Sequence, residues 1–219
     1  MKKILFFALL AVMTAGMANA QSNRKEAVKQ TEKELNAKAV KSARKEAKSL
    51  QKEGWKVAPG ALPIDKQLDK AYKMQYETDD NGYPKYIIGE AMSIGQNYDA
   101  AKMQALELAK QNMAGQIQTE VTALIENTVA NNQLEADEAV SVTKSVMASK
   151  NLISQSIGRV ITVTEVYRTD KKTKNEEVLV RIAYNSDMAR KAAINAVKKE
   201  LEQEGKDLHG KLDKLLENN

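Results

Sequence analysis

The 219-residue chain contains no cysteine, which excludes disulfide bridges and cysteine-based metal sites and leaves packing to stabilise the fold. His209 is its only histidine, so a transition-metal site would need carboxylates alone and no Ser-His-Asp triad can form. Both phenylalanines, Phe6 and Phe7, lie near the start, and Trp55 is the single tryptophan. We therefore expect a core built mainly from Ala, Val, Ile, Leu and Met.

Long apolar runs are scarce as well, and the clearest one stands at the start of the chain. Two lysines precede an apolar run over 4–12, and the small side chains of Ala18 and Ala20 form a signal-peptidase pattern. We predict an export signal over 1–20, cleaved before Gln21, and hence an exported protein that is periplasmic or associated with an outer membrane. No other stretch approaches the roughly 20 apolar residues of a spanning helix, so we expect no transmembrane helix in the mature chain.

Basic and acidic residues are nearly equal in number over the whole chain, but they are unevenly distributed along it. Removing the two lysines of the signal leaves 32 basic against 29 acidic residues, a bias too weak to indicate a nucleic-acid partner. Most of the excess lies between Arg24 and Glu53, which together with the residues between them include ten basic and five acidic side chains. This run of helix formers has no Pro or Gly before Gly54, and it predicts a long, mostly exposed basic helical arm over 21–54.

A thin apolar stripe follows one side of this predicted arm. It can pack on the chain's own domain, pair with a partner helix, or lie on an anionic envelope surface. Its members recur at helical spacing: Val28, Leu35, Ala39, Ala43, Ala47 and Leu50.

All three prolines fall in the next segment, which predicts a connector over 55–84 with a short helix over 65–76. Within it, Asn81 and Gly82 indicate a tight turn. A calcium loop with Gly82 at its sixth position fails, because Ile88 occupies the twelfth position, where a bidentate Glu is required.

The stretch over 85–204 has the strongest periodicity and predicts the core domain. An initial strand over 86–91 has Gly89 and Ala91 on one face, which leaves room for close packing. Helices over 99–129, 135–154 and 187–204 and strands over 160–167 and 177–184 follow, and 205–219 is a last amphipathic helix. The long helix repeats an apolar residue every fourth position: Ala101, Ala105, Ala109, Met113, Ile117, Val121 and Ile125.

Strand alternation is clear in both later strands. Ile161, Val163 and Tyr167 are expected on one face of their strand, and Val178, Val180, Ile182 and Tyr184 on one face of the next. Ser186 is the expected cap of the last core helix. The fold class is therefore α+β, a small and mainly antiparallel three-stranded sheet packed by long helices with an N-terminal helical arm.

The sequence contains no recognisable set of catalytic residues. Glu90, Asp99, Glu165 and Glu177 lie in or near predicted strands, but no spacing singles out a pair for general acid–base catalysis. Each is expected to be solvated or ion-paired. We expect neither a cofactor nor a metal site and predict that the protein is not an enzyme.

The stretch Gly89-Glu90-Ala91-Met92-Ser93-Ile94-Gly95, followed by Asp99-Ala100-Ala101 and the row Ala105, Ala109 and Ile117, resembles a known envelope family. This is the twenty-kilodalton outer-membrane lipoprotein family, together with the related N-terminal domain of a flagellar-ring assembly protein. The resemblance covers about residues 85 to 204 and implies a non-enzymatic module of a Gram-negative envelope that docks on other envelope components. The chain lacks the lipidated cysteine of that family, so lipid anchoring is not implied.

Three functions are consistent with this sequence. The first is an exported interaction or assembly module, whose sheet domain docks an envelope protein and whose basic arm supports contact with an anionic surface. The second is a periplasmic chaperone-like carrier whose arms hold unfolded clients. The third is an enzyme of unfamiliar design that acts on envelope polymers, which would require a polar pocket with perturbed carboxylates.

Overall fold

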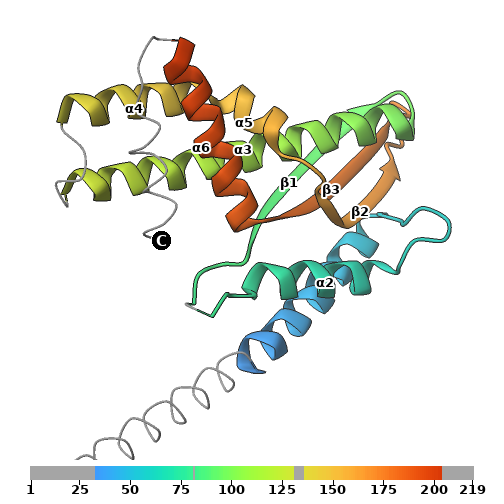
Figure 1. The fold of residues 1–219 in the computed structure, drawn as a ribbon. Helices are drawn as coiled ribbons and strands as arrows, with labels where there is room; N and C mark the ends of the chain where they lie inside the picture. The colour runs from blue at the N-terminus through green and yellow to red at the C-terminus, as the bar shows by residue number, and fades with distance from the viewer. Residues whose placement is uncertain (1–32, 81, 131–135, 204–219) are drawn as a thin grey trace, which may run out of the picture.

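The computed structural model of the chain describes residues 33–80, 82–130 and 136–203. A three-stranded antiparallel sheet lies between two groups of helices (Figure 1). The predicted α+β class is confirmed. After a helix over 33–52, the elements are α2 (Ile64–Tyr76), β1 (Tyr86–Gly95), α3 (Tyr98–Ala130), α4 (Ala136–Ala148), α5 (Lys150–Ser156), β2 (Ile161–Thr169), β3 (Glu176–Asn185) and α6 (Ser186–Gln203).

Several predictions fall outside the described residues. These are the export signal with its cleavage residues Ala18, Ala20 and Gln21, the only histidine, His209, and the amphipathic helix over 205–219.

The last strand in the chain, β3, is the central strand of the sheet, whose order is β1-β3-β2. It pairs antiparallel with both neighbours, and its alternation places Val178, Val180, Ile182 and Tyr184 in the main core, as predicted. The predicted alternation of β2 is wrong. Its register shifts between Thr162 and Thr164, so the strand contains an irregularity that changes the direction of the following side chains.

As a result, two side chains expected on one face of β2 lie on opposite faces. Val163 packs with Ala71 and Met74 of α2, whereas Tyr167 packs against the core on the α3 side.

Helix α3 packs closely on β1 at Gly89, as predicted. A Cβ at this position would lie 2.5 Å from the carbonyl oxygen of Ala109, so only a glycine lets the helix backbone come this near. The predicted alanine row is buried from Ala101 through Val121. On the outer edge of β1, Asn112 and Gln116 donate to the carbonyl oxygens of Glu90 and Ile88, so α3 also covers part of that edge.

Two helix boundaries differ from the prediction. The helix expected over 135–154 divides into α4 and α5 at Ser149, whose hydroxyl donates to the carbonyl oxygen of Val146. The cap of α6 is Asn185, whose side-chain oxygen accepts from the backbone N–H of Met188 at 3.0 Å. Ser186 does not fill that role, since its buried hydroxyl has no partner among the described residues.

The other face of the sheet is covered by α2 and the helix over 33–52, which cross below it (Figure 1). In the stripe of this helix, Ala39, Ala43, Ala47 and Leu50 are buried. The last three pack with Trp55, with Leu68 of α2 and with Val166 of β2. The stripe therefore packs on the chain's own domain, and residues 55–84 supply part of a second helical layer in addition to connecting two parts of the chain.

The turn predicted at Gly82 is present. Thr78 and Pro84 form an antiparallel bridge across it, Gly82 has a φ of 88°, and its N–H donates to the carbonyl oxygen of Asp79.

Candidate anion-binding surface

The outward side of the helix over 33–52 carries a regular row of lysines. Successive members are three or four residues apart, and every one is exposed: Lys38, Lys41, Lys45, Lys48 and Lys52. With about 100° of rotation per residue, the row occupies an arc of about 80° centred opposite the buried alanine stripe. Its length is about 21 Å at a rise of about 1.5 Å per residue. One side of the helix thus fastens it to the sheet while the other presents cations to solvent.

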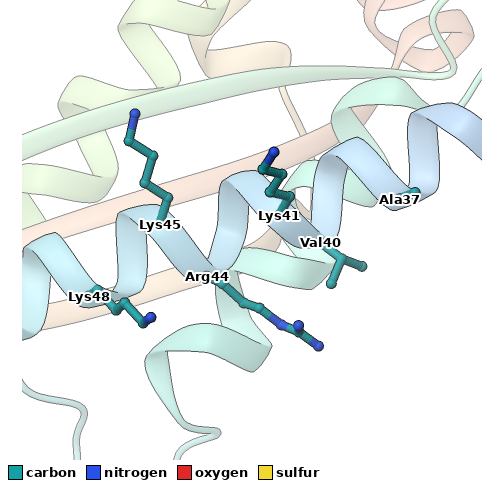
Figure 2. A pocket seen from close by; sticks show the side chains of 6 residues that line it. All are labelled: Ala37, Val40, Lys41, Arg44, Lys45 and Lys48. Carbon is teal, nitrogen blue, oxygen red and sulfur yellow. The ribbon is translucent and has the colours of Figure 1, made fainter.

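Arg44 widens this row in the middle. Together with Lys41, Lys45 and Lys48 it surrounds a shallow hollow of ≈ 370 Å³, to which Ala37 and Val40 also contribute. Figure 2 shows Lys41 and Lys45 extending to one side of the helix and Arg44 and Lys48 to the other. The five lysines and Arg44 are called the basic face below.

No carboxylate among the described residues forms a salt bridge with the basic face. Glu46 in the second half of the helix and Glu53 directly after its end turn toward the sheet instead. Glu46 lies 3.0 Å from Nη2 of Arg181 in β3, and Glu53 lies 3.6 Å from Nη1 of Arg168 in β2. Because the arginines of the sheet neutralise these carboxylates, the positive charge of the basic face is left unbalanced on the outside.

Arg181 is the centre of the attachment. Its side chain is only 11% exposed, binds Glu46 of the helix and Glu90 of β1, and lies over the ring of Tyr72 in α2 at 5.6 Å. Burial alone would lower the pKa of this guanidinium, but the charges of Glu90 and Glu46 outweigh burial and raise it. The pKa of Tyr72 rises to about 12, through burial first and then through its hydrogen bond with Glu46.

A second attachment lies nearer the end of the helix. The guanidinium of Arg168 is 4.6 Å from the centre of the Trp55 ring, and its Nε lies 2.7 Å from Glu177. Both clusters fix the orientation of the helix, and thereby the direction in which the basic face points.

The four carboxylates considered as catalytic candidates do not form a common site. Glu90 binds Arg181, Glu177 binds Arg168, and Glu165 binds Lys102 at 2.9 Å. Asp99 is exposed in the first turn of α3.

The hydroxyl of Tyr98 also donates to Glu165, and burial, followed by this bond, raises the pKa of the phenol. Among the residues that the structure describes, no group of three acidic, histidine or cysteine side chains could hold a metal ion.

In comparisons with protein-family models, curated proteins and solved structures, nothing matches this chain. The resemblance to the outer-membrane lipoprotein family therefore stays a prediction. Within the described ranges, no helix is both long and apolar enough to cross a membrane.

The composition of this segment predicted its basic charge but not the ordered row of lysines along one side of the helix. The spacing of three and four residues between successive lysines was the available signal. The inward pairing of Glu46 and Glu53 had no such signal, because their partners lie in strands more than one hundred residues later in the chain.

Proposed function

We propose that the protein is an exported, non-enzymatic module of the cell envelope that attaches to an anionic envelope surface through its basic face. The observation that carries the proposal is the separation of charge on the helix over 33–52. Glu46 of this helix and Glu53 directly after it are bound to arginines of the sheet, the third acidic residue, Glu34, is exposed in the first turn, and the outward cations form no described salt bridge. An extended row of unbalanced cations attracts a surface of opposite charge.

The mode of attachment follows from the opposite side of the helix. An amphipathic helix that inserts into a bilayer needs a free apolar side, but Ala43, Ala47 and Leu50 are already packed on the sheet domain. Attachment is therefore peripheral and ionic, and it weakens as salt screens the charges. The sheet domain remains outside the contact and is available to an envelope protein partner.

The same burial gives the chaperone-like carrier less support. A carrier that holds unfolded clients with a helical arm needs an exposed apolar surface on that arm. In the described part of this helix, the alanine stripe is covered by the chain itself.

The experiment is sedimentation of the mature chain, starting at Gln21, with vesicles of phosphatidylcholine that contain or lack phosphatidylglycerol. A variant with Lys38, Lys41, Lys45 and Lys48 replaced by Gln tests the basic face. We expect binding only to anionic vesicles, loss of binding at high salt, and a decrease of at least about 100-fold in the variant, since each lysine near an anionic surface contributes about 1 kcal/mol.

A matched control removes the same charge elsewhere, at four exposed lysines of the β2–β3 loop and α6: Lys171, Lys172, Lys191 and Lys199. This control should retain most of the binding. Equal losses in both variants, or binding that is indifferent to salt, would contradict attachment through the basic face. Fractionation of cells that express the whole chain tests the export part of the proposal.

A further inference from the structure

We propose that the hollow in the middle of the basic face binds a lipid headgroup that ends in a phosphate monoester. This inference rests on the proposed attachment to an anionic surface and names the ligand of that same face. It concerns four of the six cations, Lys41, Arg44, Lys45 and Lys48, which line the hollow, whereas Lys38 and Lys52 do not.

The first argument is the density of positive charge beside the hollow. The four cations fall within eight residues of one helix, a rise of about 10 Å, and line the hollow with Lys41 and Lys45 on one side and Arg44 and Lys48 on the other (Figure 2). None of them has a salt-bridge partner among the described side chains. Four like charges this close repel one another, and a ligand with more than one negative charge relieves that repulsion better than a monovalent one.

Donor chemistry is the second argument. Arg44 offers a planar fork of N–H donors that matches two phosphate oxygens, and the lysines add charge without a fixed geometry. A phosphate monoester carries about −1.5 to −2 charges at neutral pH and exposes three oxygens. A phosphate diester, such as the headgroup of phosphatidylglycerol, has one charge and fewer free oxygens.

The lining of the hollow favours a lipid over a free phosphate ion. Ala37 and Val40 add apolar surface beside the cations. A headgroup carries carbon atoms next to its phosphate, which can contact these side chains, whereas an inorganic ion leaves them in water.

The test compares vesicles that contain phosphatidic acid, a monoester, with vesicles that contain phosphatidylglycerol, a diester, at equal measured surface potential. We expect the mature chain to bind phosphatidic acid vesicles about fivefold more tightly, the effect of about one further charge interaction near the surface. Lys45→Gln and Arg44→Lys, both in the hollow, should reduce this preference. Lys38→Gln and Lys52→Gln should weaken binding to both vesicles alike and leave the preference intact.

The outcomes separate this inference from the proposed function. Equal binding to both vesicle types would overturn the headgroup assignment while leaving ionic attachment in place, and binding to neither would contradict both. If soluble glycerol phosphate removes the preference at the concentration of the lipid headgroup, the hollow recognises phosphate without the bilayer and the lipid assignment is wrong. If all four single variants lose the preference equally, the hollow has no special role.

Discussion

The guanidinium of Arg181 lies 3.0 Å from the carboxylate of Glu46 and connects the central strand to a helix that precedes it by 135 residues. The same guanidinium binds Glu90 of the neighbouring strand and lies over Tyr72 of α2. One side chain thus joins four elements of the second layer and the sheet. It also keeps a carboxylate of the helix away from the basic face.

Replacing Arg181 with Met should destabilise the protein by about 2 to 3 kcal/mol. Loss of one partner leaves Glu46 and Glu90 without a cation, and the cost stays below the ~3–5 kcal/mol of a fully buried pair because Glu90 still reaches water. Urea unfolding of the wild type and the variant measures the difference. Arg159→Met, at an exposed position outside any of the described salt bridges, is the control and should change stability by less than about 0.5 kcal/mol. A loss of similar size in both variants would contradict the role assigned to Arg181.

The packing of α3 on the sheet could be predicted from the sequence because its signal is local. Gly89 leaves space on β1, and the alanines at every fourth position of α3 fill it. Each of these features is visible within a window of a few residues.

Replacing Gly89 with Ala should disturb the native packing of α3 on β1, with a loss of about 3 kcal/mol, since the new Cβ would be 2.5 Å from a backbone oxygen that cannot move alone. Gly115→Ala, in α3, is the matched control. Its Cβ would meet only the end of the Lys150 side chain at 3.7 Å, so this change should stabilise the helix by about 0.5–1 kcal/mol. Thermal unfolding of the two variants should give shifts of opposite sign, and shifts of the same sign would refute the argument.

The second layer and the faces of β2 could not be predicted in the same way. Alanines give a weak apolar signal, and the attachment of their helix depends on arginines far away in the sequence. In β2, the residue pattern continues to alternate, but the register shift between Thr162 and Thr164 changes which face each side chain occupies. Such a shift arises from pairing with β3 and leaves no mark in the strand's own sequence.

Substitutions at the N-terminus of α6 test which residue caps this helix, Asn185 as in the structure or Ser186 as predicted. Asn185→Ala removes the acceptor of the Met188 N–H and should cost about 1 kcal/mol. Ser186→Ala removes a buried hydroxyl that has no partner among the described residues, so it should be neutral or slightly stabilising. Denaturant unfolding of both variants distinguishes the two residues. A larger cost at Ser186 than at Asn185 would restore Ser186 as the cap.

Alkaline titration tests the environment of Tyr72. Its pKa is raised from 10.0 to about 12 in the fold, so between these values the unfolded chain releases this proton while the folded chain keeps it. The stability that this group contributes is therefore fully present below pH 10 and is lost as the pH rises toward 12. Phenolate absorbance should show that Tyr72→Phe removes a late-titrating tyrosine. If Tyr72→Phe instead removed part of the early absorbance change, the phenol would be in contact with water and the arrangement around Arg181 and Glu46 would be looser than the structure has it.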